Sequence, residues 1–448
     1  MPLTLPLSSP ICHRGGFRKI VLWVAILSLG LGMVDYYFGI LIPIRHKQLQ
    51  IGGKNVSGNW SDLYPRWLGA RELLWHGRNP YSAEVTAGIQ RGFYGGQIGQ
   101  FDAHNPTDPQ GFAYPIYIVF LLAPLLPFPF EVVRPVFSGI LLVMTPASFL
   151  LWMRALGVRL QAGTALPVLT LAMTSYAVLD GLQLQQITLL VAFLMSASVA
   201  ALAAGSWRLA GVLLSMATVK PQLAVFLVGF LLLWSLGEWR SRKRFALATG
   251  GSMAALLIGA EVVLPGWFGW WRNAAYGYLG HHKPALLAGV LGPTPAAVVG
   301  TIAVLAFAGL CWRLRKEPAG SQRFNWMLVA AMALTALFWP NAGSSYYNQV
   351  VLFPACVWLF TSAPSLRLSL FARSLWWLAV SVLLLQWMVA ILPILATQVF
   401  GRRFERESTV IIAGPEFLVF CFPLILSLFI LSAAPGLRRQ QNPPEASA

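Results

Sequence analysis

The sequence predicts an all-α, polytopic membrane protein with eleven or twelve transmembrane helices. Hydrophobic residues make up 57% of the 448 residues and charged residues only 10%, whereas soluble domains carry roughly 25% charged residues. The apolar residues collect in long runs, and a transmembrane helix needs about 20 of them. A bilayer can bury this much apolar surface, and a soluble core cannot.

The apolar runs cover most of the chain. They occupy residues 20–44, 135–153, 163–179, 186–204, 209–236, 245–264, 286–312, 325–340, 349–364, 375–399 and 415–434. A twelfth run, 113–130, contains Pro124, Pro127 and Pro129, which predict a short, kinked or re-entrant element. We expect one transmembrane domain over 1–434, a long first external loop at 45–112 and a disordered cytoplasmic tail at 435–448.

The net charge of +17 comes from short basic clusters between the apolar runs, near residues 14–19, 240–244, 313–323, 367–373 and 438–439. Such clusters are typical of cytoplasmic loops, so we expect both termini in the cytoplasm, in contact with membrane lipids. A nucleic-acid-binding protein would gather its basic residues on one polar domain, so nucleic acid is not an expected partner. Arg402, Arg403 and Arg406 lie in a predicted external loop. They are either tolerated there or bind an external anion.

The first external loop carries a helical pattern. Apolar and aromatic residues recur at positions 63, 67, 70, 74 and 75, which predicts an amphipathic helix lying in the membrane interface. Asp62 stands just before this helix. An aspartate there is typical of an N-cap, whose side chain accepts a backbone N–H. It is also placed to act as a reactive carboxylate, and the pattern alone leaves both readings open.

This loop resembles the first external loop of glycosyltransferase family 87. The matching residues are Asp62, Tyr64, Gly69-Ala70, Leu73-Leu74, Gly77 and Pro80-Tyr81. Four later segments also resemble the family, in the same order: Phe112-Ala-Tyr114-Pro115, Asp180 to Gln186, Ala210-Gly211 to Lys220-Pro221, and Ser344 to Pro354 with Tyr346, Tyr347 and Asn348. Each motif is weak alone, and together they span residues 20–360.

The resemblance implies a C-type glycosyltransferase (GT-C) bundle whose active site faces away from the cytoplasm. Relatives include polyprenyl-phosphate-mannose-dependent mannosyltransferases of the cell envelope. The implied activity is inverting transfer of a hexose, mannose by resemblance, from a polyprenyl-phosphate donor to a lipid or glycan acceptor. Nucleotide sugars stay in the cytosol, so an enzyme facing outward needs a donor tethered in the membrane.

Inverting transfer requires a carboxylate to take the acceptor's proton and cations to hold the leaving phosphate. The resemblance assigns Asp62 as the base, and we expect Lys220 and Arg66 to bind the donor phosphate. Lys220 precedes the basic cluster at Arg240 by about 20 residues, roughly 30 Å of helix, which places it near the outer face. Pro221 would open the helix there. A snorkelling lysine would fit the same position.

Further substrate contacts are expected from residues in the resembling motifs and from the loop after Trp267. They are Tyr81, Tyr114, Asp180, Gln186, His281, His282, Tyr346 and Tyr347. Asp180 presents a conflict, because two crossings between it and Arg240 would place it on the cytoplasmic side, while the resemblance places it near the external site. A helix-end cap is its alternative role. Relatives often carry a histidine where Tyr346, Tyr347 and Asn348 stand, so no catalytic histidine is carried over.

Two other groups could carry chemistry. Asp35 lies about 24 Å up the first helix, which makes it the runner-up base, or else a headgroup-level residue beside Tyr36 and Tyr37. His104 with Asp102 and Asp108 could bind a metal or the acceptor, or form an ordinary polar loop. The chain has no DxD and no CxxC motif, so we expect no obligatory metal or cofactor.

Two other classes of function remain open at this stage. A lipid or glycan transporter or flippase would have charges through the bundle midplane and internal repeat symmetry, and neither is clear in this sequence. A structural or assembly protein of the membrane is also compatible with the long external loop.

Overall fold

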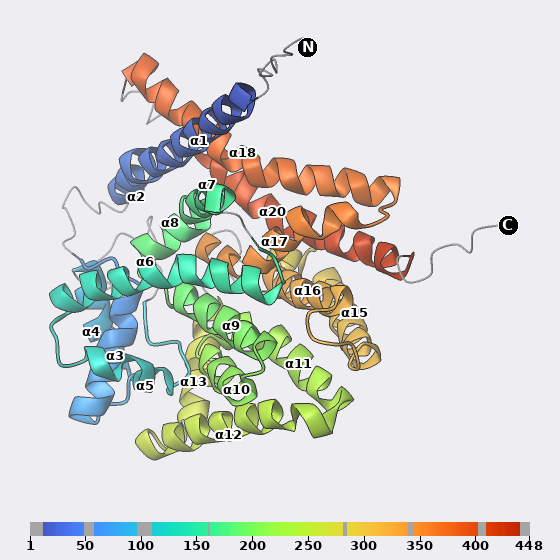
Figure 1. Cartoon of the computed structure of the whole chain (residues 1–448). Coiled ribbons are helices and arrows are strands. Elements are labelled where there is room, and N and C mark those ends of the chain that lie inside the picture. The colour runs from blue at the N-terminus through green and yellow to red at the C-terminus, as the bar shows by residue number, and fades with distance from the viewer. Residues whose placement is uncertain are drawn as a thin grey trace, which may run out of the picture.

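The computed structural model describes residues 12–48, 58–95, 110–159, 162–280, 285–338, 345–401 and 409–439. Every regular element within these residues is a helix, and the helices pack into one bundle (Figure 1). The prediction of an all-α membrane fold is therefore confirmed.

The helices of the first half are α1 (Cys12–Asp35), η1 (Tyr36–Leu41), α2 (Ile42–Gln48), α3 (Leu63–His76), α4 (Ala83–Tyr94), α5 (Ile118–Leu122), η3 (Ala123–Leu125), α6 (Phe130–Ala155), α7 (Ala162–Met173), α8 (Tyr176–Gln183), α9 (Ile187–Ala203) and α10 (Trp207–Ala217). Those of the second half are α11 (Pro221–Gly237), α12 (Trp239–Val263), α13 (Trp267–Gly280), α14 (Leu286–Leu291), α15 (Pro293–Arg313), α16 (Gln322–Phe338), η4 (Tyr346–Leu352), α17 (Phe353–Thr361), η5 (Ala363–Ser365), α18 (Leu370–Phe400) and α20 (Thr409–Arg439). α20 thus extends into the predicted tail, whose residues 440–448 lie outside the described ranges.

Six helices in the described ranges are long and apolar enough to cross a membrane. They are Ile20–Arg45, Phe130–Ala155, Trp239–Val263, Pro293–Arg313, Leu370–Val399 and Gly414–Gly436. The pair α7–α8, bent by 55°, makes a seventh if it is one span. This is fewer than the eleven or twelve predicted, because several apolar runs are divided into shorter helices. The run 209–236, for example, breaks into α10 and α11.

The first external loop holds two helices, α3 and α4, where the sequence predicts interfacial helices. They lie with α5 beside the beginning of α6 (Figure 1). Tyr64 and Trp67 of α3 contact the ring of Phe130, the first residue of α6. The loop helices are therefore fixed to one end of the bundle by aromatic packing.

The first span changes helix type near its end. α1 passes into the π-helix η1 and then into α2 without interruption. Two consecutive residues of η1, Tyr36 and Tyr37, are both buried, although successive residues of a helix ordinarily point in different directions. Single π-helical turns are often found at functional sites.

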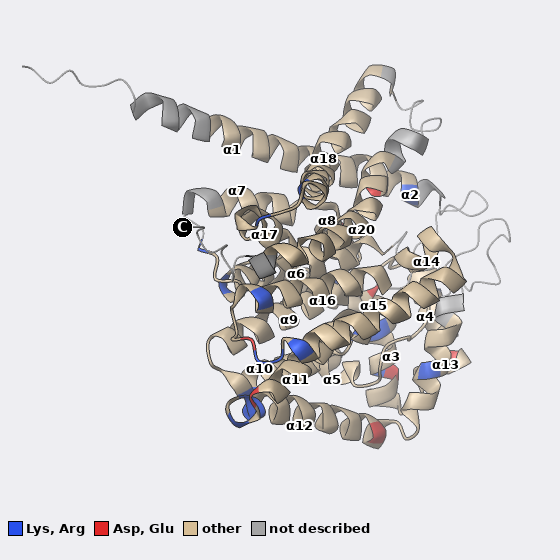
Figure 2. Ribbon diagram, turned by 90° about the vertical axis from the view of Figure 1, so that its right-hand side faces the viewer, with Lys and Arg blue, Asp and Glu red and all other residues tan. Residues whose placement is uncertain are grey.

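The centre of the bundle is occupied by α16, which is buried along Phe324–Ala336. A helix that is apolar on all sides is typical of such a position. Around it, α1, α12, α15 and α18 expose many large apolar side chains, Leu31, Val262, Ile302 and Leu370 among them. The long helices carry few charged residues, which gather near helix ends (Figure 2). This outer surface suits contact with lipid.

One buried arginine connects the ends of four helices far from the external loop. Arg242 of α12 is 3% exposed and lies 3.8 Å from the ring centroid of Trp234 in α11. Its Nη1 donates to the carbonyls of Trp234 and Arg315, and its Nη2 to that of Glu317, between α15 and α16. The guanidinium thereby satisfies carbonyls that the helix ends leave unpaired.

Replacing this arginine should destabilise the fold. We expect Arg242→Ala to lower stability by about 2 kcal/mol or more, because several hydrogen bonds to a buried charged group are lost together. Thermal unfolding in detergent measures this. Arg240→Ala removes an exposed arginine two residues away and should change the midpoint little. Equal midpoints for both variants would contradict the proposed role of Arg242.

Candidate active site

Asp62 immediately precedes α3, but its side chain makes no N-cap hydrogen bond. The carboxylate instead accepts a hydrogen bond from the side-chain amide of Gln186, between α8 and α9. The backbone N–H of Asp62 donates to the carbonyl of Leu184 at 2.9 Å. Asp62 is therefore attached to the end of α8 through both its backbone and its side chain, and its half-buried carboxylate is oriented by a neutral amide.

Arg66 lies one helical turn after Asp62 and faces the same region. Its Nη1 donates to the Asp62 carbonyl at 2.6 Å, and its guanidinium stands 4.7 Å from the ring centroid of Tyr114. Burial raises the pKa of Tyr114, and the positive charge of Arg66 acts against this shift. The hydroxyl of Tyr81 donates to the Tyr114 carbonyl at 2.6 Å. Tyr81 thus fixes the segment that supports Arg66.

Lys220 lies between α10 and α11 and is 5% exposed. Pro221 is the first residue of α11, so the predicted opening of the helix at this proline is present. The Lys220 ammonium donates to the hydroxyl of Thr188 and, at 3.0 Å, to Oδ1 of Asn348. It also lies 4.9 Å from the ring centroid of Tyr347. Both of these acceptors are neutral, and no carboxylate within the described ranges forms an ion pair with the ammonium.

Electrostatics link Lys220 to the Asp62 region. Lys220 lies outside the helices long enough to span a membrane. Burial and, to a smaller extent, the positive charge of Arg66 lower the pKa of its ammonium, the negative charge of Asp62 acts against them, and the resulting pKa is about 7. One carboxylate and two cations thus share a single electrostatic environment. An anion bound beside Lys220 would favour the charged ammonium.

The path of the chain resolves the conflict over Asp180. α9 and α10 form a hairpin that begins beside Thr188 and returns to Lys220, and α11 then leads to Arg240. Three helices, α9, α10 and α11, therefore run along the bundle between Asp180 and Arg240, whereas the apolar runs of the sequence predict two. Asp180 lies on α8, whose end contacts Asp62, so it lies at the same end of the bundle as Lys220.

Asp180 belongs to a second polar cluster. Its Oδ1 accepts from the hydroxyl of Tyr37 at 2.7 Å and from Arg45 at 3.2 Å. Arg45 also donates to Glu416 at 2.9 Å and to the Tyr176 hydroxyl at 2.8 Å. Tyr176 in turn donates to Glu416 at 2.8 Å. This cluster connects η1, α2, α8 and α20.

The short helix η4 joins the two clusters. Tyr346 packs edge-on against Tyr176 with 5.4 Å between ring centroids. The next residue, Tyr347, lies beside Lys220, and Asn348 accepts hydrogen bonds from both Lys220 and Thr188. The two predicted contacts are therefore neighbours: Tyr346 packs on the second cluster, and Tyr347 lies beside Lys220.

Some predicted residues are not joined to this site. Asp35, the runner-up base, ends α1 with an exposed side chain. His281 and His282 lie outside the described residues, as do Asp102, His104, Asp108 and the arginines at 402, 403 and 406. Within the described ranges, no group of three His, Cys, Asp or Glu residues could hold a metal ion.

Sequence reasoning missed five members of the site: Thr188, Tyr37, Arg45, Tyr176 and Glu416. Thr188 carried no signal, because a threonine at the start of an apolar helix is ordinary. Arg45 and Glu416 did carry one. Each lies at or near the end of an apolar run, and charged residues in such runs are expensive and usually paired with one another.

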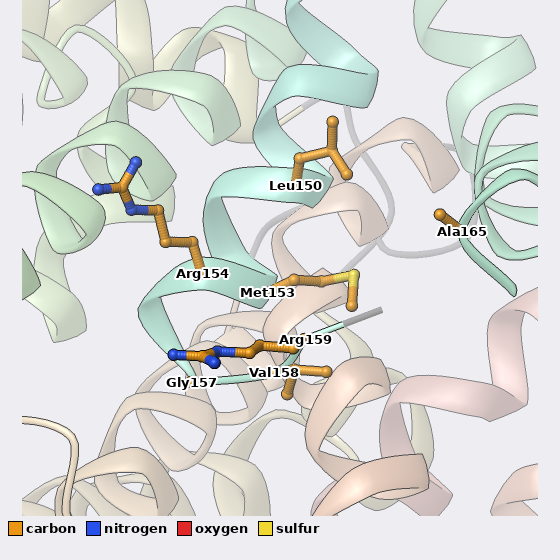
Figure 3. Close-up of a pocket in the computed structure, with 7 residues that line it drawn as sticks. All are labelled: Leu150, Met153, Arg154, Gly157, Val158, Arg159 and Ala165. Atoms are coloured by element: carbon orange, nitrogen blue, oxygen red, sulfur yellow. The ribbon is translucent and has the colours of Figure 1, made fainter. Parts of the chain in front are cut away.

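A pocket of about 510 Å³ lies elsewhere. Its lining, shown in Figure 3, consists of Leu150, Met153, Arg154, Gly157, Val158, Arg159 and Ala165. These residues belong to the C-terminal end of α6, the segment that follows it and α7, whereas the loop helices beside Asp62 pack on the first residue of α6. The pocket is therefore separate from the Asp62 site.

The fold and the site describe a helical membrane protein with a buried carboxylate–cation cluster at one end of its bundle. The family model for glycosyltransferase family 87 matches residues 112–340, about half of the chain. The chain belongs to glycosyltransferase family 87, a GT-C membrane family, and is a membrane glycosyltransferase that requires a sugar donor and an acceptor. A search of curated proteins found no match. The resemblance to this family is confirmed over residues 112–340, and the transporter and assembly readings lose their support.

A close backbone approach beside the site provides a test of its packing. A Cβ on Gly69 in α3 would lie 2.3 Å from the ring of Phe112. We expect Gly69→Ala to destabilise the protein by about 1–3 kcal/mol, because the ring must move. In α4, Gly88→Ala meets Leu68 only at 3.9 Å and should be neutral or slightly stabilising. Thermal unfolding compares the two, and a neutral Gly69→Ala would contradict the close packing.

Proposed function

We propose that this glycosyltransferase moves a hexose, mannose by family resemblance, from a polyprenyl-phosphate donor to a lipid or glycan acceptor, with inversion at the anomeric carbon. One observation carries the proposal: a half-buried carboxylate, Asp62, shares one cluster with the cations Lys220 and Arg66 in an otherwise apolar bundle. The basic loops favour an extracytoplasmic active site with both termini cytoplasmic.

The cations supply the donor phosphate site. With Lys220 protonated, Lys220 and Arg66 carry two positive charges against the one negative charge of Asp62. A phosphodiester donor carries one negative charge, so the cluster is complementary to it in sign. The leaving polyprenyl phosphate gains a second charge as the glycosidic bond breaks. Cations held in place before the reaction stabilise that developing charge most effectively.

Asp62 is the proposed general base. The acceptor hydroxyl oxygen attacks the anomeric carbon, the bond from that carbon to the phosphate oxygen breaks, and the hydroxyl proton passes to the Asp62 carboxylate. Gln186 donates to one oxygen of this carboxylate and so helps to fix the orientation of the base. A positioned base typically contributes about 10²–10⁴-fold in rate.

The remaining predicted residues take supporting roles in this proposal. Tyr81 and Tyr114 position Arg66, and Tyr347 forms one wall beside the Lys220 ammonium. His281 and His282 remain proposed sugar contacts, since aromatic and polar side chains follow one another in that loop. No metal is assigned a role.

Removing the base separates chemistry from binding. We expect Asp62→Asn to lower the transfer rate from a short polyprenyl-phosphate-mannose by about 10²–10⁴-fold and to leave donor binding within a few-fold. Radiolabel transfer to a glycolipid acceptor mixture and equilibrium binding provide the two measurements. Asp35→Asn, at the exposed runner-up position, should retain the wild-type rate. Unchanged transfer by Asp62→Asn would reject Asp62 as the base.

Donor binding should depend on pH through Lys220. Its pKa of about 7 in the free protein means that the ammonium is largely charged at pH 6 and largely neutral at pH 8.5. A phosphodiester keeps its charge over this range, so we expect donor affinity to fall by roughly tenfold or more as the pH rises. Lys220→Arg, which stays charged, should bind with little pH dependence. Parallel pH profiles for the two proteins would exclude Lys220 from the phosphate site.

A further inference from the structure

The second polar cluster has a charge opposite to that of the donor site. Arg45 contributes one positive charge, and Asp180 and Glu416 contribute two negative charges, which gives a net charge of −1. The side chains of Arg45 and Glu416 are 31% and 25% exposed, while that of Asp180 is 2% exposed. The cluster therefore presents an arginine and a carboxylate at its accessible side, with a second carboxylate behind them.

The inner carboxylate is incompletely satisfied. Asp180 accepts both of its hydrogen bonds, from Tyr37 and Arg45, through Oδ1. Its Oδ2 is buried and has no hydrogen-bond partner among the described residues. A buried carboxylate oxygen without a donor is destabilising. A ligand hydroxyl that entered as the Arg45 side chain shifted would supply the missing donor.

The cluster shares the elements α8 and η4 with the site of the proposed base, Asp62. Asp180 lies four residues before Leu184, whose carbonyl accepts the Asp62 backbone N–H. Tyr346 of η4 packs on Tyr176 in the cluster, and the following residues of η4 contact Lys220. A sugar held at the cluster would thus lie on elements that also hold Asp62 and Lys220.

The opposite net charges of the two clusters favour different substrates. A phosphate is attracted to the donor cluster and repelled by a cluster of net charge −1. Sugar hydroxyls both donate and accept hydrogen bonds, so they are matched by carboxylates, a guanidinium and tyrosine hydroxyls in one place. We propose that Arg45, Asp180 and Glu416 form the acceptor site and that it takes the hydroxyl groups of an uncharged sugar. This inference rests on the proposed transferase function.

Direct binding tests the ligand class independently of turnover. The probes are n-octyl α-mannopyranoside and its 6-phosphate, measured by ligand-induced thermal stabilisation of the full chain in detergent. Wild type should bind the neutral mannoside at least tenfold more tightly than the phosphate. Glu416→Gln should weaken binding of the mannoside by about tenfold and reduce the preference between the two probes. Equal binding of both probes by wild type would overturn the proposal.

The control is a matched ion pair elsewhere in the bundle. Glu317 pairs with Arg323 at 3.1 Å, as Glu416 does with Arg45 at 2.9 Å, and both glutamates are partly buried. Glu317→Gln should leave mannoside binding unchanged. A similar loss in both glutamine variants would indicate a general loss of stability and would reject the acceptor site. Unchanged donor binding by Glu416→Gln confirms that this variant is folded.

Transfer assays distinguish a failure of the proposed acceptor site from a failure of the proposed transferase function. With polyprenyl-phosphate-mannose as donor, Glu416→Gln should raise the acceptor KM about tenfold and leave the donor KM unchanged. A rise in donor KM alone, or no change in either, would refute the acceptor site while leaving the transferase intact. Wild-type protein that binds octyl mannoside but transfers no sugar from any lipid phosphate would refute the proposed function instead.

Discussion

The buried ammonium of Lys220 must be hydrogen-bonded wherever it lies, and much of the site follows from that requirement. In an apolar bundle the available acceptors are few, and Thr188 and Asn348 supply them from α9 and η4. Because these acceptors are neutral, the ammonium keeps an attraction for an external anion. The same contacts hold η4 beside the start of α9, and Tyr346 of η4 packs on Tyr176 of the second cluster. Lys220 therefore helps to fix the element that joins the two charged clusters.

The fold class and the loop helix after Asp62 could be predicted from the sequence because both depend on local features. Apolar runs reveal membrane helices wherever they fall, and the break at Pro221 follows from the missing amide hydrogen of proline. The loop helix after Asp62 follows from its apolar period. The number of membrane-spanning helices could not be predicted in this way. The run 209–236 is apolar on both sides of the break, so its mean hydropathy is that of a single span.

The second cluster could not be predicted for a different reason. Asp180 and Arg45 are separated by 135 positions, and Arg45 and Glu416 by 371. Each charge is visible in its own run, but its partner is chosen by tertiary packing. The position of Asp180 shows the same limit, because it depends on whether α9 and α10 return to their starting point. A single sequence does not show whether two successive apolar helices form a hairpin or continue in the same direction.

The π-helical turn at Tyr36–Leu41 sets the rotational register of the first span. A π-turn holds about one residue more than an α-turn, and one residue corresponds to roughly 100° of rotation. The part before the turn can therefore present its apolar side to lipid, while the part after it aims Arg45 at the acidic partners. Deleting one residue here would leave length and hydropathy almost unaltered and yet rotate the two parts out of phase. The sequence of the first span is thus constrained by its rotational register as well as by its hydrophobicity.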